Sequence, residues 1–186
     1  MSGLDDHETS DHVLVVRVGV VVSIVQLVVR KDADVFLTNV RPGGLTRSGL
    51  DYGSLKALNP RLVYCSLTGY GLEGPDADRP GFDIASFWSR TGVANLTIPK
   101  GGEPFPLRTA FGDHTTSIAA AAGICAALVE AARTGTGRLV EASLFRTGLY
   151  AMGSDLAIQL FFGRVASTKG RGEQNEIGRA SCRERV

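Results

Sequence analysis

The residue best suited to covalent chemistry is Asp113, which precedes a long run of small residues beginning at Thr116. A carboxylate where a loop meets a helix N-terminus has two common uses. It can cap the helix by accepting backbone N–H groups, or it can attack an activated carbonyl carbon as a nucleophile. The local sequence alone favours the cap. The adjacent His114 invites an acid–base role, but we expect a partly exposed residue at the helix entry.

The elements that position Asp113 can be predicted from local patterns. Residues 116–132 are dominated by alanine and are followed by Thr134-Gly135-Thr136-Gly137, which predicts a helix stopped by glycine. Short apolar runs predict strands, and we expect them at 34–39, 62–67 and 138–144. The motif Arg41-Pro42-Gly43-Gly44 reads as a turn. Further helices are expected at 54–58 with Ser54 as a cap, at 82–90, and at 145–162. Strands separated by helices imply a parallel sheet with helices on its faces.

Composition fits a soluble globular domain. The chain has 186 residues, of which 44% are hydrophobic and 21% charged, with a net charge of +1. That balance gives no field strong enough to recruit nucleic acid or an acidic membrane. The three cysteines are widely spaced and form no C-x-x-C pair, which indicates reduced thiols and a cytoplasmic protein. Cys125 is expected to be a small core residue.

The two ends of the chain depart from this pattern. The valine-rich residues 13–29 are interrupted by Arg17, Ser23 and Gln26 and fall short of the ~20 apolar residues of a membrane helix. The acidic start argues against a signal peptide. Within 18–29 the valines favour a strand over a helix. Residues 178–186 can be back-translated into DNA that resembles a sequencing-library adapter. We therefore expect 177–186, including Cys182, to be an artefact without function.

The motif Gly69-Tyr70-Gly71-Leu72-Glu73-Gly74 matches the G-x-G-x-x-G of dinucleotide-binding folds. That function requires a helix to begin within the glycines, so that its N-terminus faces the pyrophosphate. The prolines Pro75 and Pro80 and the aspartates between them exclude a helix interior here. We expect a loop in which glycines adopt positive φ angles.

Five segments in fixed order carry a resemblance to a known family. They are Ala33-Asp34-Val35-Phe36-Leu37-Thr38-Asn39-Val40-Arg41-Pro42-Gly43, Asn59-Pro60-Arg61-Leu62-Val63-Tyr64-Cys65-Ser66, Arg79-Pro80-Gly81-Phe82-Asp83, Gly112-Asp113 and Arg133-Thr134-Gly135-Thr136-Gly137-Arg138. Together they resemble the class III CoA-transferases, the family of formyl-CoA transferase and carnitine CoA-transferase. The resemblance covers roughly residues 32–162.

The resemblance implies a Rossmann-like parallel sheet with flanking helices, as part of an incomplete large domain, and an interlocked homodimer in the full-length protein. It divides the chain into 1–31, which does not match, a partial large domain at 32–165, and a tail at 166–186. It implies that Asp113 is the nucleophile, which reverses the preference for a cap. The CoA-binding positions that it implies are Asn39, Val40, Arg41, Arg47, Arg79, Pro80, Gly81 and Phe82.

The chemistry of the residues agrees with that implication. A carboxylate that attacks a thioester expels CoA thiolate and forms an anhydride. The incoming acid then attacks, and the returning thiolate re-forms a thioester. One nucleophile suffices, so we expect acyl-CoA and a carboxylic acid as substrates, and neither a metal nor a tightly bound cofactor. A helix N-terminus favours the Asp113 anion and supplies N–H donors for an oxyanion. Gly112 would let an acyl group approach, and Arg47 and Arg79 could pair with phosphates.

Several alternatives remain open at this point. Arg47 and Arg79 are by default solvated surface residues, Asn39 a turn residue, and Asp83 a helix cap. The related α-methylacyl-CoA racemases carry Gly-His-Asp where this chain has Gly81-Phe82-Asp83. Phenylalanine cannot exchange a proton, so this position favours a transferase. A third possibility is a truncated fragment that is inactive alone, because segments expected before residue 32 and after residue 162 are missing.

Overall fold

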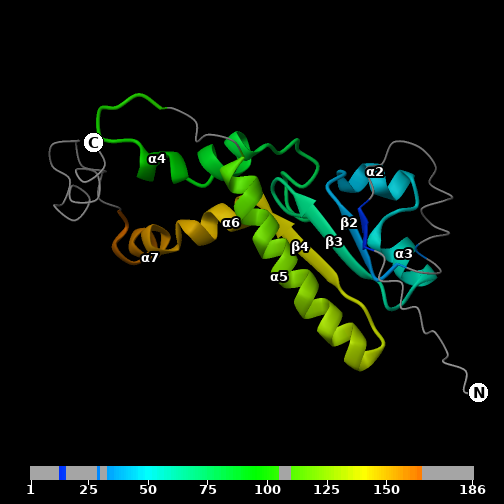
Figure 1. The fold of residues 1–186 in the computed structure, drawn as a ribbon. Helices are drawn as coiled ribbons and strands as arrows, with labels where there is room; N and C mark the ends of the chain where they lie inside the picture. The colour runs from blue at the N-terminus through cyan, green and yellow to red at the C-terminus, as the bar shows by residue number, and fades with distance from the viewer. Residues whose placement is uncertain (1–12, 16–28, 30–32, 105–109, 165–186) are drawn as a thin grey trace, which may run out of the picture.

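A four-stranded parallel sheet organises the protein (Figure 1). The computed structural model describes residues 13–15, 29, 33–104 and 110–164. The strands lie in the order β1-β2-β3-β4, and are β1 (Val13–Val15), β2 (Val35–Thr38), β3 (Val63–Thr68) and β4 (Leu139–Ser143). The predicted strands at 34–39, 62–67 and 138–144 and the parallel α/β class are confirmed.

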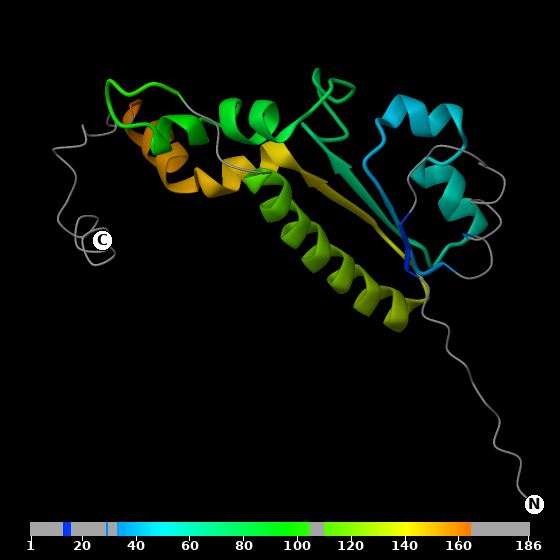
Figure 2. The ribbon, with the colours of Figure 1, turned by 45° about the horizontal axis from the view of Figure 1, so that its top comes forward.

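Helices cover both faces of the sheet because alternate side chains of each strand point to opposite faces. On one face, Phe36 and Tyr64 pack with the leucines of helices α2 (Pro42–Arg47) and α3 (Tyr52–Leu58) and of the segment between them. On the other face, Val35 and Val63 pack against helix α5 (Phe111–Thr134). Figure 2 shows α5 running along the sheet on the side away from α2 and α3.

A second group of helices lies beyond the end of the sheet at which α5 begins. It comprises the π-helix η1 (Asp83–Ser89), α4 (Val93–Thr97), α6 (Leu144–Ala151) and α7 (Gly153–Phe162). Phe87 and Trp88 of η1 form a buried cluster with Val93, Leu144 and Met152. The prediction that Phe87 and Trp88 are core residues is confirmed. The ring of Phe87 also contacts that of Phe111 at the start of α5, with 6.0 Å between ring centroids.

The helix that carries Asp113 begins earlier than the sequence predicts. It starts at Phe111 rather than Thr116, so Asp113 lies in its first turn instead of ahead of it. The residue before the helix is Ala110, which has a left-handed φ of 48° and makes no side-chain cap. The prediction failed because residues 111–115 show no helical pattern of their own.

Other boundaries also differ. The predicted turn at 41–44 forms the start of α2, because Pro42 occupies the first helical turn, where its fixed φ is favourable. Asp51, not Ser54, caps α3, and its carboxylate accepts the backbone N–H of Ser54. The single helix predicted at 145–162 is two helices that meet at Met152, which turns inward to join the buried cluster.

Two smaller predictions are wrong. Cys125 is exposed, because the side of α5 that meets the sheet is formed by Ala120, Ala127 and Ala131 instead. The backbone at Val29 is helical, not a strand. The rest of 18–29 and the whole of 177–186 lie outside the described residues.

Among the described helices, α5 alone is long and apolar enough to cross a membrane by length and composition. Its buried alanines pack on β2, β3 and β4, so it forms one layer of the α/β domain. Apolar residues remain on its outer side, where Ile118 is 72% and Val129 60% exposed.

Candidate active site

A pocket of about 520 Å³ opens at the carboxyl ends of β2 and β3. Its walls are the residues after β2 (39–42), the end of β3 (67–69), the loop at 79–82, and the first turns of α5. The carboxyl ends of parallel strands, flanked by helix N-termini, are the usual ligand site of open α/β sheets. The volume suits a small or medium-sized organic ligand.

The structure brings together most of the residues singled out from the sequence. Asp113 lines this pocket together with Asn39, Val40 and Arg41 on one side, and Arg79, Pro80, Gly81 and Phe82 on another. Arg47 is not part of the wall. It lies in the last turn of α2, where its side chain is exposed near Gly43.

The carboxylate of Asp113 is free. No described residue forms a hydrogen bond or an ion pair with its side chain, which is exposed toward the pocket. It is not the cap of its own helix, because Ala110 occupies that position. Its place in the first turn of α5 still puts it near the positive end of the helix dipole. The arrangement therefore leaves one unpaired carboxylate in contact with a ligand-sized space.

Asp83 performs the capping that the sequence assigned to Asp113. Its Oδ1 accepts the backbone N–H of Gly112 at 2.9 Å, across 29 positions of the chain. Asp83 is itself the first residue of η1, so it caps α5 and not its own helix. Burial, followed by the nearby Asp113 carboxylate, raises the pKa of Asp83, while the N–H groups of Gly112 and Phe111 and the neighbouring His114 oppose the rise.

This contact changes two expectations about the helix start. Gly112 is buried, and a Cβ added there would lie 2.2 Å from Oδ1 of Asp83 and 2.4 Å from Cγ of Phe87. Its small size therefore serves packing against η1, and Gly112 does not line the pocket. The backbone N–H of Gly112 donates to Asp83, so it is not one of the free N–H donors that the sequence predicts for an oxyanion.

The loop after β3 supplies one wall of the pocket. Gly71 and Gly74 have φ angles of 112° and 94°, and no helix begins within the glycines, so the loop prediction is confirmed. Gly69 and Gly81 bring the two ends of the loop into backbone contact, since a Cβ on Gly81 would lie 2.3 Å from Cα of Gly69. Arg79 pairs with Asp76 at 3.3 Å; the Arg79 side chain is exposed and that of Asp76 is half-buried.

Among the pocket residues that were not predicted from the sequence, two lie on α5. Thr116 and Ser117 line the pocket one turn after Asp113. The spacing i, i+3, i+4 would have revealed them, had the helix been placed from Phe111. Ser117 donates to the carbonyl oxygen of Asp113 at 2.7 Å. Thr116 is 3% exposed, and its hydroxyl has no partner among the described residues.

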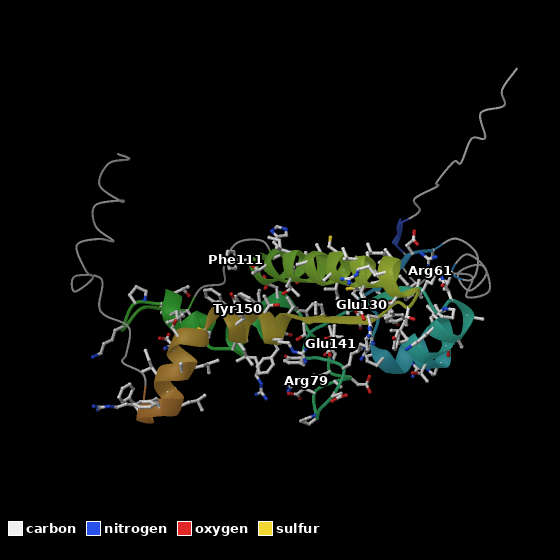
Figure 3. All side chains as sticks on the ribbon, turned by 90° about the horizontal axis from the view of Figure 1, so that it is seen from below. Arg61, Arg79, Phe111, Glu130, Glu141 and Tyr150 are labelled. Carbon is white, nitrogen blue, oxygen red and sulfur yellow. The ribbon has the colours of Figure 1, made fainter. Side chains whose placement is uncertain are left out.

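Glu141, which is not part of the pocket wall, was also not predicted, because no local sequence pattern distinguishes it. It lies on β4, and Figure 3 shows its side chain together with that of Arg79, each labelled below α5 in that view. Its contacts with the loop at 69–82 depend on the folded arrangement of distant segments.

Comparison with known proteins gives consistent results. Residues 24–182 match the model of the CoA-transferase family III. An (R)-2-hydroxy-4-methylpentanoate CoA-transferase from Clostridioides difficile is 42% identical over 123 residues, covering 66% of this chain and 31% of the relative. A cinnamoyl-CoA:phenyllactate CoA-transferase from Clostridium sporogenes is 43% identical over 122 residues, covering 66% and 30%.

A solved structure shows the same fold. The crystal structure of a CAIB/BAIF family protein from Brucella suis superposes with a TM-score of 0.73 at 36% identity, covering 80% of this chain and 39% of that one. The chain spans about 30% of the length of the two curated CoA-transferases named above. With its parallel α/β fold and a family match over most of its length, the chain belongs to the CoA-transferase family III.

Proposed function

We propose that the pocket belongs to an enzyme that transfers CoA from an acyl thioester to a free carboxylic acid, with Asp113 as the covalent nucleophile. The observation that carries the proposal is the unpaired Asp113 carboxylate, which lines one pocket with Asn39–Arg41 and with Arg79–Phe82. The curated relatives named above are CoA-transferases that act on organic acids, which supports this class of substrate.

The proposed reaction conserves the activated acyl bond. A carboxylate oxygen of Asp113 attacks the thioester carbonyl carbon, the C–S bond breaks, and CoA leaves as the thiolate. The thiolate then attacks the Asp113 carbonyl carbon of the mixed anhydride and releases the first acid as its carboxylate. The acceptor carboxylate attacks the resulting aspartyl thioester, and the thiolate finally takes the acceptor's acyl group and frees Asp113.

The other pocket residues divide into two groups by chemistry. Arg41 and Arg79 can pair with the phosphates of CoA, and the backbone and side chain of Asn39 can bind its polar groups. Arg47, at the end of α2, would reach only a part of CoA that extends out of the pocket. The position at which a racemase needs a proton-transfer group is Phe82, which is 72% exposed and has no titratable atom.

The proposal extends to the complete protein. This chain covers about 30% of its relatives, so we propose that it is inactive alone. We also propose that the full enzyme is a homodimer and, because its cysteines are few and widely spaced, that it is cytoplasmic. Exposed apolar side chains on outward helices support an interface of this kind, among them Ile118 of α5 and Phe161 of α7 at 72% and 82% exposure.

The test compares this chain with a hybrid transferase, defined here as this chain extended by the remaining segments of the C. difficile relative. Both are incubated with a panel of acyl-CoA donors and carboxylic acids, and CoA exchange is measured by mass spectrometry. We expect transfer by the hybrid transferase and none by the chain alone. Hydroxylamine added during turnover should convert Asp113 to a hydroxamate, and a label found only on other residues would reject the proposed mechanism.

A further inference from the structure

We propose that Asp83 is a positioning residue for the nucleophile, because its carboxylate holds the first turn of α5 through the backbone N–H of Gly112. This inference rests on the proposed function, since it assigns Asp83 to the same reaction. Oδ1 of Asp83 lies 2.9 Å from the Gly112 nitrogen. The Gly112 peptide leads directly into Asp113, so a shift of this peptide moves the nucleophile.

Close packing leaves this contact little freedom. A Cβ added at Gly112 would lie 2.2 Å from Asp83 and 2.4 Å from Phe87, which is buried in η1. The start of α5 is therefore held against η1 by the hydrogen bond to Asp83 and by contact with the ring of Phe87. Because Gly112 lacks a side chain, the carboxylate can reach the backbone directly.

No other residue takes over this role within the described part of the chain. Two other helices are capped by the residue just before them, since Asp51 caps α3 and Ser143 caps α6 through their own side chains. The residue before α5 is Ala110, which makes no side-chain cap bond. The cap of α5 comes instead from Asp83 of η1, so the geometry of the start of α5 depends on a neighbouring element.

The same contact connects two walls of the pocket. Asp83 directly follows Phe82, the last residue of the loop wall, and Gly112 directly precedes Asp113. The hydrogen bond between Asp83 and Gly112 therefore joins the wall proposed to hold CoA to the helix that carries the nucleophile. Covalent attack requires the reacting atoms to be about 3–3.5 Å apart, so a displacement of 1 Å is costly.

The charge of Asp83 is not what this role requires. The Asp113 carboxylate repels it and, together with burial, raises its pKa. An asparagine could accept the same bond from Gly112 without that repulsion. Asp83→Asn is therefore the conservative variant, and Asp83→Ala is the variant that removes the bond.

The experiment uses the hybrid transferase with three variants, Asp83→Ala, Asp83→Asn and Asp51→Ala. Asp51 is the matched control, because it also caps a helix, accepting Ser54 at 3.1 Å, but lies outside the pocket wall. We expect Asp83→Ala to lower kcat on the order of 10²-fold while the KM for acyl-CoA stays nearly unchanged. Asp83→Asn should restore kcat close to the wild-type value. Asp51→Ala should lower the unfolding temperature and leave kcat unchanged.

Hydrogen exchange at the Gly112 amide reports the bond independently of activity. The amide should be protected in the wild type and in Asp83→Asn, and should exchange rapidly in Asp83→Ala. A folded Asp83→Ala enzyme with wild-type kcat would overturn the inference. An Asp83→Asn enzyme with lowered kcat would also overturn it. The asparagine variant therefore tests the inference even if the alanine variant does not fold. Absence of transfer by the unmodified hybrid transferase would instead reject the proposed function.

Discussion

The side chain of Glu141 on β4 accepts the backbone N–H of Leu72 at 2.9 Å, across 69 positions of the chain. Its other carboxylate oxygen lies 3.5 Å from Nη1 of Arg146. Leu72 belongs to the loop whose later residues, Arg79–Phe82, form a wall of the pocket. Glu141 thus ties a loop of the proposed CoA site to the sheet.

Removal of this tie is expected to weaken CoA binding. Glu141→Ala leaves the Leu72 N–H without its acceptor, and a hydrogen bond to a charged group contributes about 1.5–3 kcal/mol. If about half of that free energy is lost from the CoA-bound state, about 0.75–1.5 kcal/mol, the dissociation constant for acyl-CoA should rise about three- to tenfold. Isothermal titration calorimetry on the hybrid transferase measures it.

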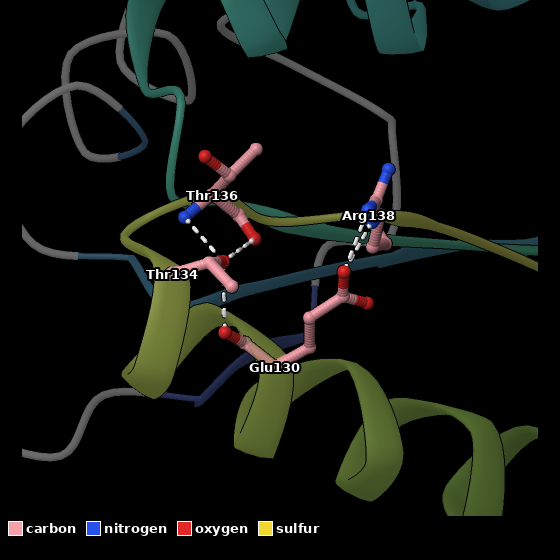
Figure 4. Close-up of polar contacts among 4 residues, drawn as sticks. All are labelled: Glu130, Thr134, Thr136 and Arg138. Atoms are coloured by element: carbon pink, nitrogen blue, oxygen red, sulfur yellow. Dashed lines mark hydrogen bonds and ion pairs between the residues drawn. The ribbon is translucent and has the colours of Figure 1, made fainter.

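Glu130 provides the control for this variant. It pairs with Arg138 at 2.6 Å on the surface, as Figure 4 shows. Glu130 lies about 25 Å along α5 from Asp113 at a rise of 1.5 Å per residue. Glu130→Ala should therefore leave acyl-CoA affinity unchanged, because the pair is exposed and remote from the pocket. Equal affinity losses in both variants would contradict the role given to Glu141.

Gly81→Ala is expected to disrupt the pocket wall. The new Cβ would lie 2.3 Å from Cα of Gly69 and 2.8 Å from Oγ of Ser86, and the first of these is backbone that cannot rotate away. The loop ends must separate, which should weaken acyl-CoA binding by at least about tenfold and lower the unfolding temperature. Gly153→Ala is the matched control, since nothing lies within 4 Å of a Cβ there. An alanine at Gly81 tolerated as well as one at Gly153 would refute the close backbone contact.

The raised pKa of Asp83 predicts a pH-dependent stability. The folded protein holds the Asp83 proton more tightly than the unfolded chain, whose aspartates titrate near 3.8. Its favourable contribution is therefore present below that pH and is lost as the pH rises through the folded-state pKa. Asp83→Asn removes this dependence, so the stability of the variant relative to the wild type should increase with pH across this window. Urea unfolding at several pH values from ~3.5 to ~7 measures the difference, and a constant difference would contradict the shift.

The sequence predicts the sheet because its signals are local. The apolar run at β3 and the glycine stop after α5 both depend on neighbouring residues, and both are found where expected. The gathering of Asn39, Arg79 and Asp113 around one pocket follows from the same parallel arrangement, which brings strand ends to one edge.

The features that the sequence does not predict are non-local. The start of α5 depends on Asp83, which accepts Gly112 from 29 positions away, so no pattern near Phe111 reveals it. Glu141 finds its partner Leu72 only when β4 lies beside β3. The helical pattern at 145–162 is interrupted at Met152, whose side chain packs in a buried cluster with the distant Phe87 and Trp88.

The most direct measurement is the transfer rate of the hybrid transferase after Asp113→Ala. All covalent chemistry in the proposed reaction depends on this one unpaired carboxylate, so CoA transfer should fall on the order of 10⁴-fold or more, while free CoA binds as before and the fold is retained. A variant that still transfers CoA at a rate near that of the wild type would contradict the account.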